Sequence, residues 1–559
     1  MKIFCNIASH LDYRTKMTPS KKAVIFSNSG LIRKNKIFYT HLTFQDLQNK
    51  TNQFANGLKD IGIEKGTKVL LMVKPGLDFI ALVFAIFKTG AVPILIDPGM
   101  GLKKLFKCIE EVKPDIFIGI PLAHYLRQVY YRAAFKSVKK HISTSQTYLP
   151  GIISMAQLRA EKNSEFTTVE TSPEDVAAIL FTTGSTGPAK GVVYTHGIFL
   201  TQIEIIKREY NITENDIDLP TFPLFALFSV AIGATVVIPD MNPTQPAKVN
   251  PKKIISAIKD NAVTSSFGSP ALWKTVSEFC SQHNIKFLTL TKILMAGAPV
   301  PAKLHHLLLH KILTKNAETY TPYGATESLP IATFTGSQVL SSTAEKTGMG
   351  EGVCVGYPVK ECEIKIIKIT DDIIEMWDDS LVLSDGAIGE IAVKGPMVTK
   401  EYYKLPEKTR HAKITTVSKG FWHRMGDLGY FDDKGRLWFC GRKTHRVVAK
   451  NKTYYTVKSE AIFNQHPMVF RSALVGIGED RYNQTPVIII EPEVTFSQSS
   501  LTLKQLTEEL LTLAQKSHLT SEIRTVLFHR SFPVDIRHNA KIFREKLAIW
   551  AEKKNFQNK

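Results

Sequence analysis

The sequence predicts an α/β protein with a large N-terminal body and a smaller C-terminal α+β domain. Its 559 residues are too many for a single hydrophobic core, so more than one domain is expected. Strand-like and helix-like segments alternate from residue 68 to residue 120, which is typical of parallel βαβ units. From residue 442 onward the order of segments changes to that of a small α+β domain.

The alternation in the body can be followed element by element. The predicted strands are Lys68–Val73, Ala91–Ile96 and Asp115–Ile120. The predicted helices are Asp78–Lys88 and a segment in which Leu102, Leu105, Ile109 and Val112 recur at spacings of three and four. The same alternation returns near residues 253–265 and 292–295. A large α/β body with several subdomains is therefore expected over residues 1–441.

The C-terminal segment, residues 442–559, reads as one compact unit. The predicted strands are Val447–Ala449, Ala473–Ile477, Val487–Glu491 and Thr525–Phe528, and the predicted helices lie near Ser459–Gln465 and Leu503–Gln515. No low-complexity linker precedes this segment, so we expect a short hinge between the two domains rather than a flexible tether.

The chain carries a formal net charge of +20, a value that invites comparison with proteins that bind nucleic acids or anionic membranes. Lys and Arg are scattered, however, and no basic run is interleaved with aromatic residues. We therefore expect no nucleic-acid partner and at most peripheral membrane contact. The N-terminal residues lack the pattern of a signal peptide, and the six cysteines show no pairing pattern. A cytoplasmic location is expected.

The strongest local signal is the segment Phe181-Thr-Thr-Gly-Ser-Thr-Gly-Pro-Ala-Lys-Gly191. It lies between two strand-like runs, and its glycines let successive backbone N–H groups face a phosphate. The additional donors are the side chains of Thr182, Thr183, Ser185, Thr186 and Lys190. The segment is not a Walker A loop, because Ala189 stands where that loop requires glycine. By itself, a cluster of this composition would more often be a surface turn.

Further segments, in a fixed order, accompany this loop. They are Ala296-Gly-Ala-Pro299, Tyr320-Thr-Pro-Tyr-Gly-Ala-Thr-Glu327, His423-Arg-Met-Gly-Asp427, Gly441-Arg442 and Asn539-Ala-Lys541. Together with residues 182–191 they resemble the motifs of the adenylate-forming superfamily, which includes acyl-CoA synthetases and adenylation domains. The resemblance spans nearly the whole chain. It implies a large body and a small, mobile C-terminal lid domain, with ATP and Mg²⁺ as cofactors.

The resemblance also implies roles for individual residues. The implied ATP- and AMP-binding residues are Thr182, Thr183, Gly184, Ser185, Thr186, Gly187, Lys190, Gly297, Ala298, Pro299, Tyr323, Gly324, Asp427 and Arg442. Tyr323 would stack on adenine, and Asp427 would accept both ribose hydroxyls. The implied catalytic residues are Thr326, Glu327 and Lys541. Among these, Glu327 would hold Mg²⁺, and Lys541 would stabilise charge as it develops on the reacting groups.

Several stretches resemble one branch of the superfamily, the olefin β-lactone synthetases. They include Asp218–Phe228, Gly268-Ser-Pro270 and Trp438–Lys443. This branch converts a long-chain 2-alkyl-3-hydroxy acid and ATP to a β-lactone within a long-chain olefin pathway, whose other enzymes are possible partners. The implied substrate-pocket residues are Phe222, Phe225 and Ala226. A small side chain at Ala226 would leave room for the C2 branch; the alternative is neutral drift in an ordinary pocket for linear acids.

Three other functions remain open. The first is a long-chain fatty acid–CoA ligase. That function is disfavoured because residues 447–455 contain no glycine where CoA ligases usually carry a pair, so CoA is not expected. The hinge position, Thr444, also differs from the Asp or Lys that is usual in the family. The second is a catalytically silent nucleotide-binding protein, and the third is a basic scaffold for nucleic acid or membrane.

Overall fold

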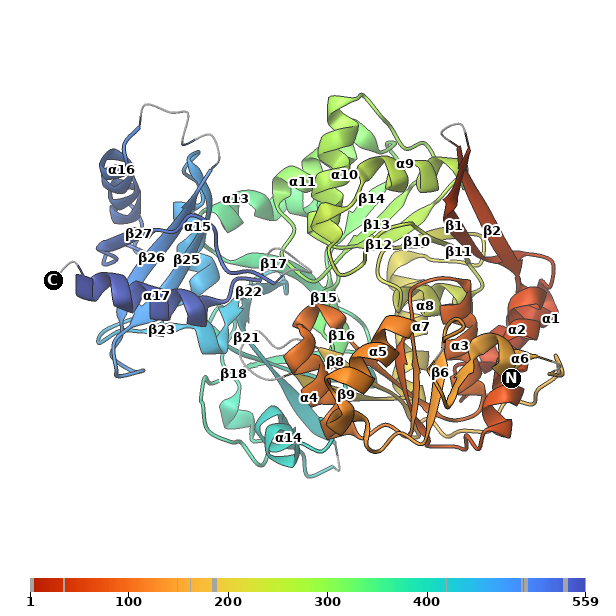
Figure 1. The fold of residues 1–559 in the computed structure, drawn as a ribbon. Coiled ribbons are helices and arrows are strands. Elements are labelled where there is room, and N and C mark those ends of the chain that lie inside the picture. Colours follow the sequence, from red (N-terminus) through yellow and green to blue (C-terminus); the bar gives the residue numbers. More distant parts are fainter. Residues whose placement is uncertain are drawn as a thin grey trace.

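The computed structural model describes residues 5–33, 36–147, 149–160, 162–182, 189–418, 420–493, 496, 501–535 and 541–557. It shows a large N-terminal α/β body and a smaller C-terminal domain, drawn in blue at one side of Figure 1. The predicted fold class is thereby confirmed. Five of the six cysteines, Cys108, Cys280, Cys354, Cys362 and Cys440, are buried free thiols.

The first body sheet confirms the predicted βαβ units. Its strand order is β7-β6-β5-β3-β4-β8-β9, and only β8 and β9 are antiparallel neighbours within it. The bounds are β3 (Lys68–Met72), β4 (Val92–Ile96), β5 (Ile116–Gly119), β6 (Lys140–Ser143), β7 (Ile152–Ser154), β8 (Val176–Thr182) and β9 (Lys190–Thr195). Most residues of β3, β4 and β5 are buried, because helices cover both faces of a parallel sheet.

A second seven-stranded sheet has the order β14-β13-β12-β10-β11-β1-β2. Its strands are β1 (Lys22–Arg33), β2 (Lys36–Thr43), β10 (Ile217–Pro220), β11 (Thr235–Ile238), β12 (Ser265–Gly268), β13 (Lys292–Met295) and β14 (Glu318–Tyr320). The pairs from β14 to β1 are parallel, and the edge hairpin of β1 and β2 is antiparallel.

Helices fill the space between these two sheets and cover their outer faces. The main hydrophobic core joins both sheets through α2 (Phe44–Asp60), α3 (Leu77–Lys88), α7 (His196–Tyr210) and α8 (Phe225–Ile232). The outer face of the first sheet is covered by α4 (Leu102–Val112) and α5 (Pro121–Val129), and that of the second by α9 (Pro251–Asp260) and α10 (Pro270–Gln282). The helix α3 is buried on all sides, which explains its almost wholly apolar sequence.

A third, antiparallel sheet completes the body. Its order is β15-β16-β17-β22-β21-β19-β18, with β20 paired to β21. The bounds are β15 (Tyr323–Ala325), β16 (Ser328–Thr333), β17 (Val353–Pro358), β18 (Glu363–Ile367), β19 (Gly389–Lys394), β20 (Lys413–Thr415), β21 (Phe421–Phe431) and β22 (Leu437–Arg442). The shorter helices of the body are α1 (Ser9–Met17), α6 (Met155–Arg159), α11 (Ala302–Leu307), α12 (Gly336–Gln338), α13 (Ala344–Gly348) and α14 (Pro406–Ala412).

The C-terminal domain has its own sheets and cores. A three-stranded sheet is formed by β25 (Val469–Ile477), β26 (Thr485–Pro492) and β27 (Thr525–Phe528), beside a small hairpin of β23 (Val447–Val448) and β24 (Thr453–Tyr454). Three helices pack around them: α15 (Thr456–Phe463), α16 (Leu503–Gln515) and α17 (Arg544–Gln557). The sequence pattern predicted every one of these elements except β24 and α17. Because β22 ends at Arg442, we propose that the domain boundary lies at residue 442.

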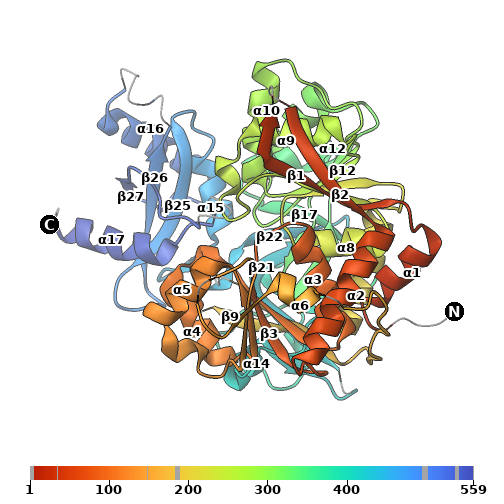
Figure 2. The same cartoon turned by 45° about the vertical axis from the view of Figure 1, so that its right-hand side comes forward.

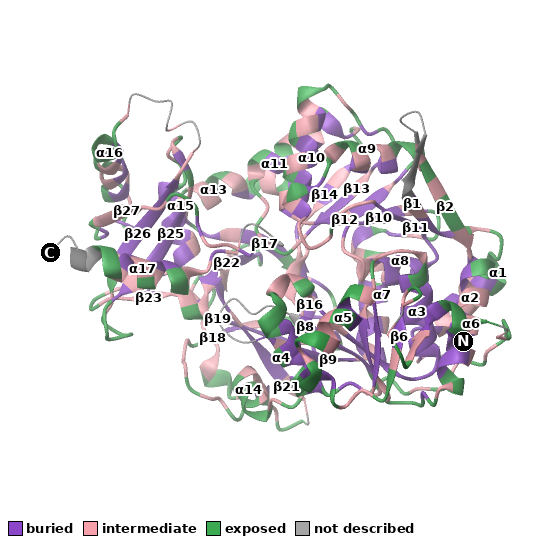
Figure 3. Ribbon diagram, viewed as in Figure 1, coloured by how far each residue is buried: buried purple, intermediate pink, exposed green. Residues whose placement is uncertain are grey.

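The burial pattern follows this layering. Figure 3 shows the strands largely buried and the outer faces of the peripheral helices exposed. Figure 2, turned from the first view, shows the C-terminal domain beside the body, which it contacts through α15 against β22 and α13. Ion pairs join the two parts near the junction, including Arg446 with Asp371 at 2.6 Å and Lys458 with Glu351 at 3.4 Å.

Candidate functional site

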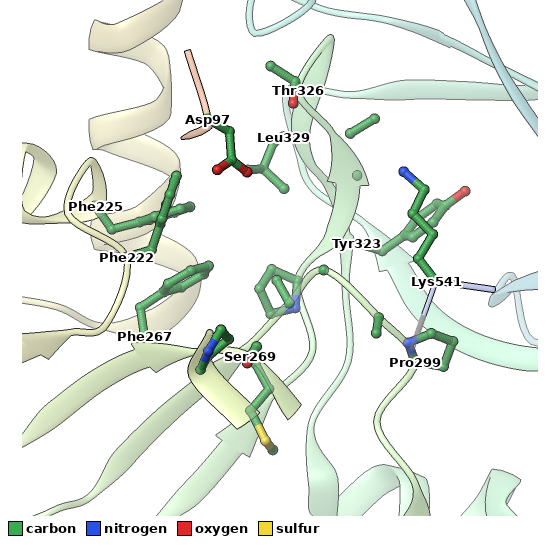
Figure 4. Close-up of a pocket in the computed structure, with 18 of the residues that line it drawn as sticks. Asp97, Phe222, Phe225, Phe267, Ser269, Pro299, Tyr323, Thr326, Leu329 and Lys541 are labelled. Carbon is green, nitrogen blue, oxygen red and sulfur yellow. The ribbon is translucent and has the colours of Figure 1, made fainter. Parts of the chain in front are cut away.

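A cavity of about 2320 Å³ lies between the body and the C-terminal domain. It reaches the carboxyl ends of β3, β4 and β8, the edge at which open α/β sheets usually bind ligands. The predicted site residues that line it are Lys190, Phe222, Phe225, Gly297, Ala298, Pro299, Tyr323, Gly324, Thr326, Glu327, Asp427, Arg442, Thr444 and Lys541. In Figure 4, Lys541 and Tyr323 lie on one side of the cavity and three phenylalanines on the other.

Part of the predicted phosphate loop lies outside the described residues. This applies to Thr183, Gly184, Ser185, Thr186 and Gly187, and to the side chain of Thr182. The flanking strands are described: β8 pairs with β9, and Thr182 lies opposite Lys190 in their ladder. The two ends of the loop are therefore held together at the edge of the sheet, beside the cavity that Lys190 lines.

Strand pairing places Asp427 beside Arg442. The two residues face each other in the antiparallel ladder of β21 and β22, and their side chains form an ion pair of 2.9 Å. The phenol of Tyr323 donates a hydrogen bond of 2.7 Å to the other oxygen of Asp427. The Asp427 carboxylate raises the pKa of Arg442, and burial raises the pKa of Tyr323. This trio forms a polar, preorganised wall of the cavity.

Thr326 and Glu327 form the tight turn between β15 and β16. Ala325 pairs with Ser328 across this hairpin, so the two residues project from its tip. Gly324 is required just before the turn, because a Cβ there would come within 2.4 Å of the Ser328 carbonyl oxygen. The carbonyl of Thr326 accepts from the Tyr194 phenol at 2.6 Å, and that of Glu327 accepts from the Thr399 amide at 2.9 Å. The turn is therefore fixed from two sides.

The side chain of Glu327 is held by Tyr402. The phenol of Tyr402 donates to Glu327 Oε1 at 2.7 Å, and the Lys190 ammonium lies 4.5 Å from the centre of the same ring. Burial lowers the pKa of Lys190, and the charge of Glu327 opposes that shift. One carboxylate, one ammonium and one phenol thus form a compact group on the cavity wall, close to the ends of the phosphate loop.

A second lysine lies behind this group. Lys413 is half-buried, donates a hydrogen bond to the carbonyl of Thr399, and lies 4.8 Å from the centre of the Phe421 ring. Desolvation lowers its pKa to about 7. In the ladder of β20 and β21, Lys413 faces His423, whose pKa is lowered well below its usual value by burial and by Lys413. Lys413 supports Glu327 indirectly, because Thr399 holds the Glu327 backbone.

Lys541 enters the cavity from the C-terminal domain. Its carbonyl accepts from the Asp535 amide at 2.9 Å, just before the bridge between Val534 and Ile542. Burial and the charge of Arg442 lower its pKa, whereas Asp535, Asp427 and Glu327 raise it. The residues before it in the predicted motif, Asn539 and Ala540, lie outside the described part of the chain.

The opposite side of the cavity is apolar. Phe222, Phe225, Phe267 and Leu329 line it, and the rings of Phe225 and Phe267 are stacked with 3.6 Å between their centres. Figure 4 shows Phe222, Phe225 and Phe267 together, with Asp97 and Leu329 above them. This wall suits a hydrocarbon chain, because apolar surface removed from water stabilises binding.

Ala226 does not lie where the sequence analysis placed it. It is completely buried on the inner face of α8, in the core between the two large sheets, and it does not line the cavity. The helix starts at Phe225, so the next residue is rotated by about 100° away from the cavity. The expectation that the Ala226 methyl group contacts the substrate branch is therefore corrected.

The glycine-free segment also lies away from the cavity. Val447 pairs with Tyr454 across the hairpin of β23 and β24, and both are buried in a core of the C-terminal domain. None of residues 447–455 lines the cavity in this arrangement of the domains. Thr444, the predicted hinge residue, lies in a short 3-10 turn over Lys443–His445 and does line the cavity.

The structure adds residues that the sequence analysis missed: Tyr194, Phe267, Tyr402 and Lys413. Tyr402 and Lys413 lie far along the chain from Glu327 and belong to none of the recognised motifs. Phe267 directly precedes Gly268-Ser-Pro270, a stretch that was noted for its resemblance, and it could have been included on that ground. Tyr194 lies within β9, the strand after the phosphate loop, and belongs to none of the recognised motifs.

With this geometry in place, three comparisons identify the class of protein. The model of the AMP-binding enzyme family matches residues 11–403. The chain is 41% identical over 557 residues, 99% of this chain and 98% of the relative, to olefin β-lactone synthetase of Xanthomonas campestris pv. campestris. It is also 41% identical over 553 residues, 98% of each chain, to olefin β-lactone synthetase of Stenotrophomonas maltophilia. An amide bond synthetase, McbA from Marinactinospora thermotolerans, shares the fold with a TM-score of 0.77 and 21% identity, over 97% of this chain and 99% of that one.

The chain belongs to the family of AMP-binding enzymes, the adenylate-forming ligases. It uses ATP to activate a small-molecule acyl substrate as its adenylate. Among the helices that the structure describes, none combines the length and apolar character needed to cross a bilayer.

Proposed function

We propose that this enzyme activates a long-chain 2-alkyl-3-hydroxy acid with ATP and closes it to a β-lactone, releasing AMP. The observation that carries this proposal is the 41% identity, over nearly the full length of both chains, to two olefin β-lactone synthetases. The apolar wall of Phe222, Phe225 and Phe267 supports a hydrocarbon substrate. The other enzymes of a long-chain olefin pathway are the partners that this function implies.

The nucleotide would lie against the polar wall of the cavity. Tyr323 would stack on the adenine, with Gly297, Ala298 and Pro299 beside it, and Asp427 would accept the ribose hydroxyls. The preorganisation of Asp427 by Tyr323 and Arg442 supports this role, since both neighbours hold the carboxylate in one orientation. Thr326 would donate to the α-phosphate from the tip of the hairpin.

The residues around Glu327 fit a magnesium ion. Oε1 accepts from Tyr402, and Oε2 makes no hydrogen bond within the described part of the chain. Among the described residues, no group of three or more His, Cys, Asp or Glu could bind a metal by protein ligands alone. A single carboxylate suits Mg²⁺, which is commonly held by one or two carboxylates together with substrate phosphates and water. When bound, the ion would neutralise charge on the departing pyrophosphate.

The chemistry would then have two steps. A substrate carboxylate oxygen attacks the α-phosphorus, and the bond to the pyrophosphate oxygen breaks with its electron pair. The substrate's own 3-hydroxyl oxygen next attacks the acyl carbon, the bond to AMP breaks with its electron pair, and the hydroxyl proton is released. The Lys541 ammonium would stabilise the negative charge that shifts between carboxylate and phosphate, as fixed charges aimed at a developing anion do.

Tethering explains why no external nucleophile is needed. The hydroxyl belongs to the activated acid, so its effective molarity can be large, roughly 10⁵ M in favourable cases, although ring strain reduces it. CoA is accordingly not expected as a substrate. A long-chain fatty acid–CoA ligase remains the alternative, and a catalytically silent nucleotide-binding protein is the alternative of another class.

The test pairs two substrates that differ by one oxygen. The two substrates are a 2-alkyl-3-hydroxy acid and the same acid lacking the 3-hydroxyl. With each, the enzyme is assayed for ATP–pyrophosphate exchange and for release of AMP from the acyl-adenylate. We expect exchange with both acids but β-lactone and net AMP release only with the hydroxy acid. Net AMP release without CoA from both acids would contradict ring closure by the hydroxyl, and absence of exchange would contradict adenylation.

A further inference from the structure

The outward face of α5 carries apolar side chains where a surface helix normally carries polar ones. Leu122 is 61% exposed, Tyr125 43% and Val129 67%, and Tyr130, directly after the helix, is 72% exposed. Spacings of three and four place the first three on one side of the helix. The opposite side, with Ala123 and His124, is buried against the sheet. This face is therefore an exposed apolar stripe rather than part of the core.

Basic residues lie beside this stripe. The helix α4 runs next to α5 on the same face of the first sheet, and both helices contact the short 3-10 helix η2 (Arg132–Phe135) that follows α5 (Figures 1 and 2). The helix α4 begins with Leu102, which is 49% exposed. The exposed cations of this surface are Lys103, Lys104, Lys107, Arg132 and Lys136. None of the five forms an ion pair with a carboxylate among the described residues. Glu110 and Glu111, exposed acids on α4, lie in its last turn, away from Leu102.

The same elements border the cavity. The cavity is lined by Ile120 and Ala123, which lie on either side of Leu122 in the chain. It is also lined by Lys74, after β3, and by Asp97 and Pro98, after β4. Leu102 follows this last segment by a few residues, at the start of α4. The exposed apolar residues at the beginning of α4 and α5 thus lie at the carboxyl edge of the sheet, where the cavity reaches the surface of the body.

We propose that the first turn of α4 and the outward face of α5 dock this enzyme on an anionic lipid bilayer. The proposal rests on the proposed function, because a long-chain acid is the substrate that would gain from a membrane source. Apolar side chains flanked by lysines suit the boundary between headgroups and acyl chains, and the exposed tyrosines suit the same depth. Charge complementarity selects anionic lipid over a neutral surface. A chain leaving the bilayer would enter the cavity past Ile120.

The experiment is flotation of the full-length enzyme with vesicles, which requires no catalysis. Vesicles of phosphatidylcholine alone are compared with an equal mixture of phosphatidylcholine and phosphatidylglycerol. We expect binding to the mixed vesicles only, weakened by added salt. The double variant Val129→Ser, Tyr130→Ser should bind at least about tenfold more weakly, because two apolar side chains no longer enter the interface. Leu288→Ser, at a residue that is 77% exposed on another part of the body, is the matched control and should bind like the wild type.

Two further measurements make the result decisive. The thermal unfolding of the double variant, and its ATP–pyrophosphate exchange with a short, water-soluble acid, should equal those of the wild type, because both positions are outside the cavity. Lys103→Glu combined with Lys104→Glu should abolish the preference for anionic vesicles. The proposal is overturned if the wild type ignores the mixed vesicles, or if all variants bind them equally. Failure of lactone formation would refute the proposed function instead, and it would leave the vesicle result unchanged.

Discussion

Removal of one phenol oxygen tests how the structure holds the proposed metal ligand. In Tyr402→Phe the ring stays, so its contact with the Lys190 ammonium at 4.5 Å is kept. The hydrogen bond of 2.7 Å to Glu327 Oε1 is lost. A hydrogen bond to a charged group contributes roughly 1.5–3 kcal/mol, and about 1.4 kcal/mol corresponds to a factor of ten. Water can replace part of this interaction when no metal is bound, so we expect the lower end of the range.

The assay is ATP–pyrophosphate exchange as a function of Mg²⁺ concentration. The Mg²⁺ concentration at half-maximal exchange should rise by roughly tenfold in Tyr402→Phe. Glu327→Gln should raise it further, because an amide oxygen carries less charge than a carboxylate. Tyr403→Phe is the matched control: within the described structure the hydroxyl of that neighbouring residue donates one hydrogen bond, to the Val112 carbonyl at 3.5 Å, and its loss should leave the requirement unchanged.

A double variant separates positioning from a general loss of activity. If Tyr402 acts through Glu327, then adding Tyr402→Phe to Glu327→Gln should change the Mg²⁺ requirement little, because the interaction is already removed. An unchanged Mg²⁺ dependence in Tyr402→Phe would refute the reasoning. So would a full additional tenfold shift on the Glu327→Gln background, since the phenol would then act independently of the carboxylate.

Four further results are expected. Lys541→Ala should slow adenylation by roughly 10²–10³ while ATP still binds, and an unaltered exchange rate would remove Lys541 from the mechanism. A thiol assay should detect no consumption of CoA, and thioester formed from a simple fatty acid as fast as AMP would restore the ligase alternative. Ala226→His should destabilise the protein by about 1–3 kcal/mol, measured by denaturant unfolding, and should reduce turnover of branched and linear acids alike; a loss confined to branched acids would return Ala226 to the pocket. Burial lowers the pKa of Lys413 to about 7, below its unfolded value, so the side chain binds fewer protons when the protein is folded. The free energy of unfolding should therefore rise with pH between about 7 and 10, by up to about 1.4 kcal/mol per pH unit. An equally steep pH dependence in Lys413→Met would contradict this.

The sequence predicted the fold well where its signal was local. The alternation from residue 68 to residue 120 predicted three strands and two helices that the structure confirms, because buried parallel strands and amphipathic helices have distinct periodicities. The helix α17 was missed, since Ala548, Ile549 and Trp550 lie between its buried residues Leu547 and Ala551, so polar residues do not alternate with apolar ones there to mark the buried face. The antiparallel third sheet was not predicted, because its register depends on pairing between distant strands.

The site residues that belong to recognisable sequence motifs were predicted. Those that only the folded chain brings together were missed. Asp427 and Arg442 were both expected to bind the nucleotide, and their positions across one ladder place them together. Tyr402 lies 75 residues from its partner Glu327, so no spacing in the sequence links the two. Ala226 shows the converse error: it was placed in the pocket from its position in the motif, but one step of the α-helix turns its side chain into the core.

The most direct test of the proposed function is the mass of the product formed from a 2-alkyl-3-hydroxy acid and ATP, measured with and without CoA. The account predicts a product that is lighter than the acid by one water, formed in equal amount with AMP, and unchanged by CoA. A product heavier by CoA minus water, formed only when CoA is present, would show that the adenylate is passed to a thiol and would contradict ring closure by this enzyme.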